Sequence, residues 1–381
     1  MPPSPRKRIL ILSASVGGGH LRAAEAVEAA IRQTAPRAET RNIDVLTLAS
    51  RAFRRVYGRW YLDFAQRAPH FLGYVYDRLD RPKEGKIEFE PDTLRILLEK
   101  LNMQPFLKLL KSETWDIVVN THFLPAEIIG SLSAAGRIGL PQVTVTTDFM
   151  THRLWLQEPC AHYFTATEEG AAYLAALGVE PERLTVSGIP IHPVFCRRKA
   201  RRDCLDAHGM KGIRPAVLVL SGGFGVGPIA EILQGVLAID IPMEVVVVCG
   251  RNAELPQRLA DLPRPERHAL TIVGYTTAID ELMAVADVVI TKPGGLTSAE
   301  VLARGCAMAI VNPIPGQESR NSDYLLENAA AIKIGPLPTL SYKLAALLRD
   351  TDRLTQLKAN ARRLGRARAA FTIAEKVLAL A

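Results

Sequence analysis

The feature that most constrains the fold is a repeated order of elements along the chain. The first copy is an apolar run at 9–12, a glycine-rich turn at 13–20 and a predicted helix over 21–34. The order restarts with an apolar run at 216–220, which leads into a glycine-rich turn at 221–227 and another predicted helix. Strand, turn and helix in this order are typical of parallel, doubly wound α/β sheets. The chain therefore predicts two Rossmann-like domains.

Other short apolar runs continue the alternation through both halves. The further predicted strands are 40–45, 117–120, 143–147, 163–166 and 184–187 in the first half, and 244–249, 271–273, 288–291 and 309–312 in the second. Predicted helices include 168–177 and the tail, 354–381. We predict an N-terminal domain over 1–192, a basic linker over 193–212, a C-terminal domain over 213–365 and a terminal segment over 366–381. Because parallel sheets bind ligands at the carboxyl ends of their strands, we expect the ligands in a cleft between the two sheets.

Composition narrows the compartment and the partners. The chain of 381 residues has a net charge of +8 and five scattered cysteines, none of them paired at metal-site spacing. Scattered cysteines in an odd number favour a reduced cytoplasmic compartment. No apolar stretch approaches the ~20 residues that a membrane-spanning helix needs. Any work at a membrane is therefore expected at its surface.

The segment 51–64 has a composition suited to such a surface. Aromatic residues recur in it at helical spacing, and arginines fill the positions between them. A basic amphipathic helix can lie in the interface of an anionic bilayer, where each cation contributes about 1 kcal/mol. The same pattern fits an ordinary helix that packs its aromatic side chains inward. We expect an anionic membrane surface, and no nucleic acid, as the partner of this segment.

Three polar loops follow predicted strands in the second half. The loops 221–227 and 291–300 each lie between a strand and a helix, and their glycines let backbone N–H groups approach a phosphate closely. Glu300 lies about one turn into the second of these helices, where a carboxylate can bind the two hydroxyls of a ribose. The loop 313–321 carries amide and carboxylate groups that suit the hydroxyls of a sugar: Gln317, Glu318 and Asn321.

His20 is the unusual residue of the first half. It lies on the first turn of a predicted helix, and a helix N-terminus lowers imidazole basicity and favours the neutral form. A neutral imidazole can act as a general base, although the residue could also be a capping or packing histidine. Polar side chains after the strand 143–147 could line an acceptor pocket: Asp148, His152 and Trp155. Asp148 could equally cap a helix, Trp155 could belong to the core, and the strand end at 120–122 is similarly ambiguous.

Several short motifs occur in a fixed order along the chain. In the first half they are ILILSASVGGGH at 9–20, TDF at 147–149 with His152 and Trp155, and GIP at 188–190. In the second half they are CGRN at 249–252, GY at 274–275, KPGGLT at 292–297 with Glu300, and PGQE at 315–318 with Asn321. As a set, these motifs resemble the monogalactosyldiacylglycerol synthase and processive diacylglycerol glucosyltransferase family. The resemblance implies the GT-B fold, an α/β architecture of two Rossmann-like, doubly wound domains facing a central cleft.

The resemblance also implies an activity and a set of roles. It implies an inverting transferase that uses a UDP-sugar, needs no metal or other cofactor, and glycosylates diacylglycerol or a glycosyl-diacylglycerol. His20 would be the catalytic base, and the acceptor would be bound by Gly18, Gly19, Asp148, His152 and Trp155. The UDP-sugar would be bound by Ser221, Gly222, Gly223, Arg251, Val273, Tyr275, Lys292, Gly294, Gly295, Leu296, Thr297, Glu300, Gln317, Glu318 and Asn321. The terminal helix, 366–381, would return to the N-terminal domain.

Within the donor set, the resemblance divides the roles by chemistry. The loops at 221–223 and 292–297 would hold the diphosphate, and the backbone near Val273 and Tyr275 would hold uracil. Glu300 would bind the ribose, and the loop that carries Gln317 and Glu318 would bind the sugar. The expected location is cytoplasmic, peripheral on the inner face of the cell membrane.

Two departures from the family pattern concern the acceptor side. Arg153 stands where the family often has proline, and His192 stands where another charged residue is more common. A polyprenyl-linked lipid that receives N-acetylglucosamine is therefore an alternative acceptor. A UDP-sugar 2-epimerase or a non-catalytic nucleotide-sugar sensor would also use the donor loops. A dinucleotide-dependent oxidoreductase, for which Asp44 follows the first glycine-rich turn, fits least because the best phosphate loops lie in the second half.

Overall fold

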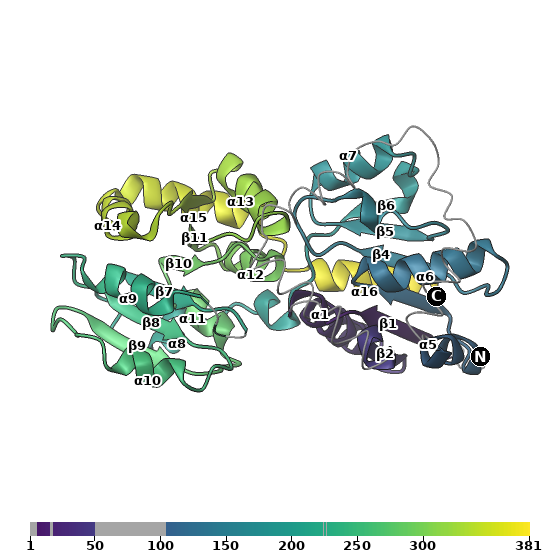
Figure 1. The fold of residues 1–381 in the computed structure, drawn as a ribbon, viewed down its shortest axis with the longest axis horizontal. Coiled ribbons are helices and arrows are strands. Elements are labelled where there is room, and N and C mark those ends of the chain that lie inside the picture. The colour runs from purple at the N-terminus through teal and green to yellow at the C-terminus, as the bar shows by residue number, and fades with distance from the viewer. Residues whose placement is uncertain (1–5, 16–17, 50–103, 224, 226) are drawn as a thin grey trace. The chain divides into compact units, whose positions relative to one another are not determined.

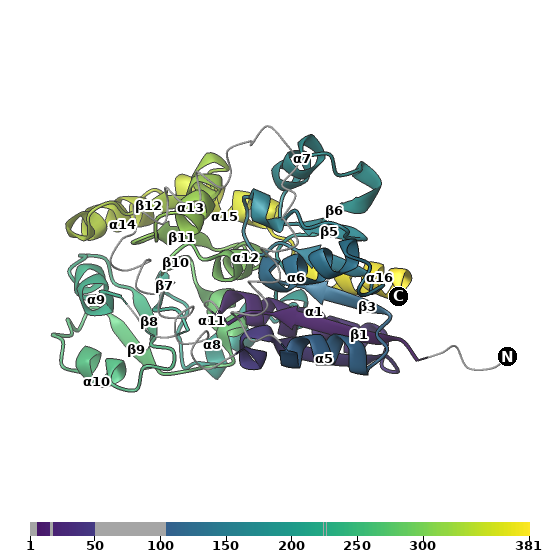
Figure 2. The same cartoon turned by 45° about the vertical axis from the view of Figure 1, so that its right-hand side comes forward.

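The structure is a computed structural model that describes residues 6–15, 18–49, 104–223, 225 and 227–381 (Figures 1 and 2). The chain divides into two units. Unit 1 comprises Met1–Pro193, Pro315–Gln317 and Ala367–Ala381. Unit 2 comprises Val194–Ile314 and Glu318–Arg366.

Unit 1 is built on a six-stranded parallel sheet in the order β2-β1-β3-β4-β5-β6. Its strands are β1 (Arg8–Ser13), β2 (Glu39–Asp44), β3 (Ile117–Asn120), β4 (Gln142–Val145), β5 (His162–Thr165) and β6 (Leu184–Val186). Its helices are α1 (Gly19–Thr34), α5 (Gln104–Ser112), α6 (Phe123–Ala134), α7 (Glu168–Ala176) and α16 (Ala369–Leu380), with short 3₁₀ turns η1 (Val45–Leu48), η2 (Arg153–Trp155) and η3 (Pro181–Arg183).

The apolar run of β1 explains how this sheet is covered on both faces. Successive side chains of a strand point to opposite faces. Ile9 and Ile11 accordingly belong to a core formed with α1 and α16, whereas Leu10 and Leu12 belong to a core formed with η1, α5 and α6. All four are fully buried, and burial of an aliphatic side chain of this size is worth roughly 1.5–3 kcal/mol. A run that is apolar at every position is what a parallel strand covered on both faces requires.

Unit 2 repeats the architecture with a six-stranded parallel sheet in the order β12-β11-β10-β7-β8-β9. Its strands are β7 (Ala216–Leu220), β8 (Glu244–Val248), β9 (Ala269–Val273), β10 (Val288–Thr291), β11 (Ala307–Ile310) and β12 (Ala331–Lys333). Its helices are α8 (Arg201–Ala207), α9 (Ile229–Leu237), α10 (Leu255–Ala260), α11 (Ile279–Val285), α12 (Gly295–Arg304), α13 (Gln317–Glu327), α14 (Leu340–Arg349) and α15 (Thr351–Leu364). Short 3₁₀ turns are η4 (Pro193–Cys196) and η5 (Leu337–Thr339).

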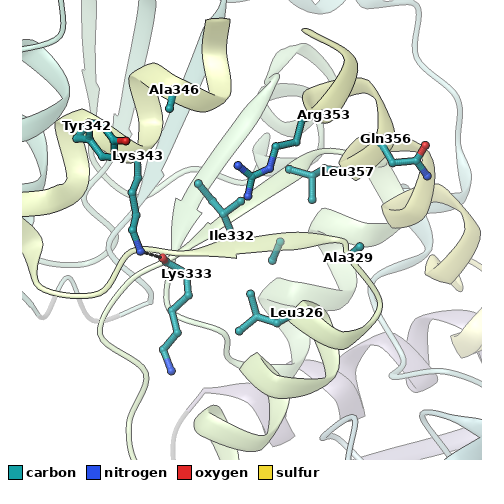
Figure 3. A pocket seen from close by; sticks show the side chains of 11 residues that line it. Leu326, Ala329, Ile332, Lys333, Tyr342, Lys343, Ala346, Arg353, Gln356 and Leu357 are labelled. Atoms are coloured by element: carbon teal, nitrogen blue, oxygen red, sulfur yellow. Dashed lines mark hydrogen bonds between the residues drawn. The ribbon is translucent and has the colours of Figure 1, made fainter. Parts of the chain in front are cut away.

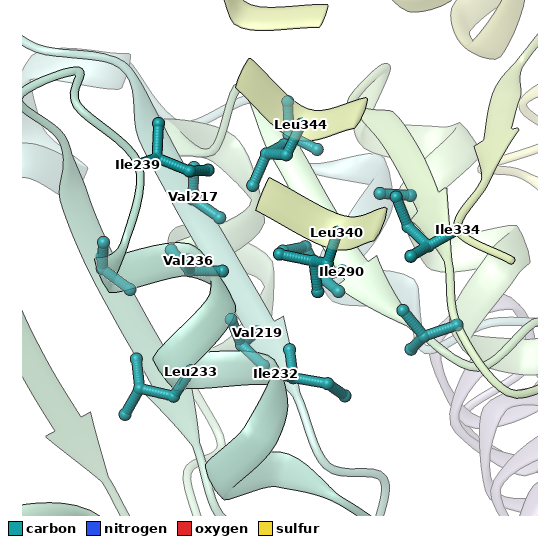
Figure 4. Close-up of a cluster of buried hydrophobic side chains, with 14 of the residues drawn as sticks. Val217, Val219, Ile232, Leu233, Val236, Ile239, Ile290, Ile334, Leu340 and Leu344 are labelled. Atoms are coloured by element: carbon teal, nitrogen blue, oxygen red, sulfur yellow. The ribbon is translucent and has the colours of Figure 1, made fainter. Parts of the chain in front are cut away.

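The main core of unit 2 lies on one face of this sheet, where side chains of β7 and β10 meet those of α9 and α14 (Figure 4). Val217 and Val219 of β7 point into this cluster together with Ile290 of β10. Leu233 of α9 and Leu344 of α14 cover them and are themselves fully buried. Such a core gives the strand ends of unit 2 a rigid base.

The strands predicted from the apolar runs are confirmed in both units, with shifts of one or two residues at several ends. The sequence missed β12, whose three residues, Ala-Ile-Lys, end in an exposed lysine and do not form an apolar run. The tail is not one helix over 354–381, as predicted. It breaks between α15 and α16, where Gly365 lies so close to α12 that an added Cβ would be 2.6 Å from the Leu302 carbonyl oxygen.

The segment 193–212, which we predicted as a linker, contains η4 and α8. Lys199 anchors the start of α8 to α11 of unit 2, since its Nζ lies 2.9 Å from Asp280 Oδ2 and 2.6 Å from Glu281 Oε1. Arg304 also contacts Asp280, at 3.1 Å, and both of these side chains are almost fully buried. The basic side chains of this segment are thus partly used within the fold.

Candidate functional site

Each sheet has one topological switch point, where the order of strands reverses direction. In unit 1 the chain passes from β1 to β2 on one side and later places β3 on the other side of β1. In unit 2 it passes from β7 to β8 and later places β10 on the other side of β7. Ligands of doubly wound sheets bind outside the carboxyl ends of the strands at these points. His20 lies at the first switch point, and the two phosphate-type loops lie at the second.

His20 is the second residue of α1 and is partly buried. Its ring Nδ1 lies 2.9 Å from the carbonyl oxygen of Thr121, the residue that follows β3, and 3.0 Å from Thr147 Oγ1, just beyond β4. The Thr121 hydroxyl donates to the His20 carbonyl oxygen at 3.0 Å. Loops after three neighbouring strands therefore fix one imidazole ring.

These contacts determine the tautomer of His20. A carbonyl oxygen can only accept a hydrogen bond, so the Nδ1 atom that lies 2.9 Å from the Thr121 carbonyl must carry the proton. In the neutral ring the other nitrogen, Nε2, then keeps its lone pair. An imidazole with a fixed Nδ1–H and a bare Nε2 is able to accept a proton at Nε2.

Burial keeps His20 neutral. Desolvation lowers its pKa to about 4, and the hydrogen bond to Thr121 opposes this only in part. We predicted the neutral form from the helix N-terminus; the direction is confirmed, and burial is its main cause. His122, at the N-terminus of α6, also has its pKa held well below the usual range by burial and by the neighbouring His20 and His152.

Aromatic rings surround His20 within unit 1. The His122 ring lies edge-on to it at a centroid distance of 4.5 Å, and the Trp155 ring lies at 6.2 Å. His152 and Phe123 join the cluster, at 5.8 and 5.9 Å from the Trp155 ring. The structure thus brings three of the predicted unit 1 residues together: His20, His152 and Trp155.

The remaining predicted residues of unit 1 lie near this cluster in sequence. Asp148 is buried and lies three residues after the end of β4, and Trp155 is fully buried in η2. Gly18 and Gly19 begin α1, and a Cβ added at either would meet no described atom within 4 Å. Asp44, which a dinucleotide site would need as a free carboxylate, is already used within the fold. Its Oδ1 accepts hydrogen bonds from the N–H groups of Ser15 and Leu46.

Sequence reasoning missed three members of the cluster or gave them no role. Phe123 was not singled out, His122 was left ambiguous, and Thr147 appeared only as part of a motif. Thr121 and His122 directly follow β3, next to β1, so the position of these strands at the switch point was the signal that could have found them.

Two helix N-termini at the second switch point lack a side-chain cap. α9 begins after Pro228 and α12 after Gly294, and no described side chain accepts from their first-turn N–H groups. In unit 1, His122 caps α6 and Thr167 caps α7, whereas α1 also begins without a side-chain cap. Uncapped N–H groups and the helix dipole attract anions, phosphate above all. The two helices therefore present donors to the same end of β7 and β10.

The loop after β7 has glycines where only glycine fits. Gly222 has φ +76°, and Gly250 of the next strand's loop has φ +61°. A Cβ at Gly250 would lie 2.5 Å from the Gly222 carbonyl oxygen and 3.0 Å from that of Gly223. Arg251 N donates to Gly223 O at 3.2 Å, and Ser221 Oγ donates to Val248 O at 2.8 Å. These hydrogen bonds hold the loop in place, and a Cβ added at Gly222 or Gly223 would meet no described atom within 4 Å.

The side chain of Lys292, which follows β10, lies close to the loop that follows β7. An added Cβ at Gly227 would lie 3.8 Å from its Cε and 4.0 Å from its Nζ, so the ammonium group lies over the end of the first loop. No carboxylate among the described residues forms a salt bridge with Lys292. Lys292 therefore adds a positive charge to two uncapped helix N-termini.

Glu300 of α12 and three residues of α13 carry the carboxylate and amide groups of the predicted donor site. An added Cβ at Gly294 would be 3.9 Å from Glu318 Oε1, while Glu318 Oε2 accepts from Ile314 N at 2.8 Å. Glu300 and Asn321 are almost fully buried. Gln317 begins α13 and is partly buried. The structure thus places Glu318 beside the Gly294 loop, on the side away from β7.

The loops after β8 and β9 place an aromatic ring at the neighbouring strand ends. Tyr275 is 61% exposed, and the Arg251 guanidinium lies 5.3 Å from its ring centroid. Val273, the last residue of β9, accepts from Cys249 N at 2.7 Å. An exposed ring stacked with an arginine, beside a strand end, is a surface on which a flat base can lie.

Four further observations concern features other than the predicted site residues. A cavity of about 600 Å³ lies at the edge strand β12, between α13, α14 and α15, and no predicted donor residue lines it (Figure 3). Within the described ranges, no three His, Cys, Asp or Glu side chains gather closely enough to hold a metal ion. No helix of the described chain is both long and apolar enough to span a bilayer. The predicted basic-aromatic segment 51–64 lies outside the described residues.

Two parallel doubly wound sheets, each with a glycine-rich loop at its switch point, are the architecture of the GT-B fold. Solved structures agree on the fold: MurG of Acinetobacter baumannii has a TM-score of 0.60 at 15% identity and covers 98% of this chain and 100% of its own. The UDP complex of S. aureus MnaA has a TM-score of 0.60 at 13% identity, covering 98% of both chains.

Family models match both halves of the sequence. Residues 20–191 match the family model of monogalactosyldiacylglycerol (MGDG) synthase, and residues 217–377 match that of the glycosyltransferase family 28 C-terminal domain. The N-terminal half is thus similar to MGDG synthases and the C-terminal half to family 28 glycosyltransferases, and the resemblance seen in the motifs is confirmed.

Curated relatives agree with this assignment. A processive diacylglycerol beta-glucosyltransferase of Bacillus subtilis (strain 168) is 28% identical over 376 residues, which are 98% of this chain and 95% of the relative. A protein of the same name from Bacillus pumilus (strain SAFR-032) is 34% identical over 239 residues, 63% of this chain and 62% of the relative.

Proposed function

We propose that this protein transfers a hexose from a UDP-sugar to diacylglycerol or a glycosyl-diacylglycerol, with inversion at the anomeric carbon. The observation that carries the proposal is the His20 ring, whose Nδ1 is committed to the Thr121 carbonyl and whose Nε2 is left as a base. The names of the curated relatives support the diacylglycerol acceptor. Solved structures of similar fold that contain UDP or UDP-glucose support the donor.

In this proposal unit 2 binds the UDP-sugar at its switch point. The diphosphate lies against the loop of Gly222 and Gly223 and the N-terminus of α12 at Gly295, with Lys292 above it. Uracil lies by Val273 and Tyr275, with Arg251 supporting the tyrosine ring. The remaining donor residues contribute around these: Ser221 and Gly294 shape the loops, Leu296 and Thr297 belong to the first turn of α12, Glu300 binds the ribose, and Gln317, Glu318 and Asn321 bind the sugar.

Unit 1 supplies the base and binds the acceptor. His20 Nε2 removes the proton from the acceptor hydroxyl as that oxygen bonds to the anomeric carbon, and the bond from this carbon to the diphosphate oxygen breaks. The electron pair of the broken bond leaves with UDP, and attack opposite the leaving group inverts the centre. Gly18, Gly19, Asp148, His152 and Trp155 are the residues that we assign to the acceptor.

The negative charge that develops on UDP needs stabilisation as the bond breaks. Lys292 and the N–H groups of α9 and α12 provide positive charge at the diphosphate without waiting for solvent to reorganise. We propose that these groups suffice, so that turnover requires no metal ion.

A lipid acceptor places the reaction at a membrane. We propose that the protein works in the cytoplasm, peripherally on the inner face of the cell membrane, and that the basic-aromatic segment 51–64 contacts anionic lipid there. The arginines of this segment and the net charge of +8 support the proposal. Flotation of the full chain with phosphatidylglycerol vesicles, and its loss in 0.5 M salt, is the corresponding observable.

One assay separates the candidate functions. The protein is incubated with radiolabelled UDP-glucose, UDP-galactose or UDP-N-acetylglucosamine, with liposomes that contain either diacylglycerol or a polyprenyl-linked lipid, and the lipid extract is chromatographed. Labelled diacylglycerol products with a β-linkage by NMR support the proposal. Label only on the polyprenyl lipid, an altered free sugar nucleotide, or binding without turnover would replace it with the corresponding transferase, epimerase or sensor.

A further inference from the structure

The His20 ring has a second oxygen at the nitrogen that does not do the chemistry. Thr147 Oγ1 lies 3.0 Å from Nδ1, and the Thr121 carbonyl oxygen lies 2.9 Å from the same atom. Thr147 is only 4% exposed, and it follows β4 by two residues. The hydroxyl is thus buried against the ring rather than left in solvent.

The Thr147 hydroxyl can only be an acceptor in this contact. If it donated its proton to Nδ1, the Nδ1 lone pair would face both that hydroxyl and the Thr121 carbonyl, and the carbonyl contact at 2.9 Å would be repulsive. With the proton on Nδ1, both oxygens accept from it. The Nδ1–H of His20 is therefore shared between a backbone carbonyl and a threonine hydroxyl.

We propose that Thr147 is a positioning residue for the base: its hydroxyl oxygen orients the His20 ring and stabilises the imidazolium that forms when Nε2 takes the acceptor proton. This inference rests on the proposed function, in which His20 is that base. The proton taken from the acceptor stays on Nε2, the Nδ1 proton stays where it is, and Thr147 itself gains and loses none.

The charges around Nδ1 explain why a second neutral oxygen matters. Among the described residues, both hydrogen-bond acceptors on Nδ1 are neutral oxygens, and no carboxylate bonds to it. A cationic ring buried in this way is costly unless its N–H groups are fully satisfied. Hydrogen bonds from a charged donor are about twice as strong as neutral ones. The Thr147 contact therefore strengthens as the ring becomes charged, which lowers the barrier more than it stabilises the resting enzyme.

Three substitutions test this role. Thr147→Val keeps the shape and removes the hydroxyl, Thr147→Ser keeps the hydroxyl, and Thr144→Val is the matched control. Thr144 is a fully buried threonine of β4 whose Oγ1 faces Cys160 Sγ and does not contact His20. We expect Thr147→Val to lower kcat roughly tenfold or more, with KM for the UDP-sugar changed by less than about twofold. Thr147→Ser and Thr144→Val should each stay within about threefold of the parent.

A second measurement does not depend on any variant folding. Nitrogen-15 NMR of the histidine-labelled parent protein should show His20 protonated at Nδ1 and bare at Nε2. A proton on Nε2 instead, or a Thr147→Val enzyme as active as Thr144→Val, would overturn the role of Thr147. If His20→Ala is inactive and Thr147→Val is normal, only this inference fails; if His20→Ala is active, the proposed base itself fails.

Discussion

The two switch points of this protein share one topology but differ in the chemical groups that they carry. In unit 1 the switch point holds an imidazole fixed by oxygens from two other loops, inside a cluster of aromatic rings. In unit 2 it holds glycines with open space above them, two uncapped helix N-termini and one lysine. A reversal of strand order in a parallel sheet provides a place for a ligand, and the loop residues at that point decide which chemistry it supports.

The difference follows from what each task requires. A histidine that acts as a base must have one unprotonated ring nitrogen directed at the substrate. This requires a hydrogen-bond acceptor at the other nitrogen and enough packing to hold the ring in one orientation. A diphosphate needs several donors and room for close approach, which backbone N–H groups provide only where side chains are absent. The comparison therefore predicts that some substitutions lower the rate of the chemical step without weakening donor binding, and that others weaken donor binding alone.

The largest effect expected is the loss of chemistry without loss of donor binding. His20→Ala should lower kcat roughly 10²–10⁴-fold, because proton removal from the acceptor loses its general base. The Kd for UDP, measured by titration calorimetry, should change by less than about twofold, since the groups proposed to bind the uracil, ribose and diphosphate are in unit 2. His208→Gln is the control, because His208 contacts Glu281 at 3.0 Å on α11 and lies outside both switch points. An equal fall in UDP affinity would show that His20 serves the donor or the fold.

The next effect is a loss of stability of unit 1 in acid. In unit 1, burial lowers the pKa of His20 and of His162 to about 4, and that of His122 lies well below its usual range. In the unfolded chain these rings bind protons from about pH 6.5, so unfolding takes up protons between about pH 6.5 and 4. The free energy of unfolding of unit 1 should therefore fall as the pH drops through this window, by up to about 1.4 kcal/mol per pH unit for each ring.

Tryptophan fluorescence can follow this transition selectively, because the three tryptophans of the sequence, Trp60, Trp115 and Trp155, all precede Val194, where unit 2 begins. Urea unfolding at pH 7 and pH 5 should show the loss of stability, and His162→Gln should make the dependence on pH shallower. Equal urea midpoints at the two pH values in the parent protein would contradict the assignment of these rings as neutral and buried.

The smallest effect expected is a loss of donor binding without loss of stability. A Cβ at Gly223 meets no described atom within 4 Å, so Gly223→Ala should leave Tm unchanged. The same Cβ would lie where the diphosphate is proposed to approach the backbone, so the Kd for UDP should rise roughly tenfold. Gly335→Ala, whose Cβ is equally unobstructed in unit 2, is the matched control for both measurements. Unchanged UDP affinity in Gly223→Ala would show that the diphosphate does not bind at this loop.

The sequence predicted the sheets well because their signal is local. Apolar runs such as 9–12 and 216–220 are short, continuous and followed by glycine, and each of them is a strand in the structure. The glycine-rich loops of unit 2 were predicted for the same reason, since a turn and a helix start are encoded in adjacent residues. The strand β12 was missed because its three residues end in an exposed lysine and form no apolar run. The break at Gly365 was missed because it depends on the contact of Gly365 with α12.

What the sequence determined by itself was the order of strands, loops and helices, and the presence of a histidine and of glycine loops at strand ends. Only the tertiary structure decided what those residues contact. Thr121 and Thr147 are far from His20 along the chain, and they reach it because β3 and β4 follow β1 in the sheet. A tautomer depends on which atom lies across from a ring nitrogen, and that is a property of strand order, which no local pattern of residues carries.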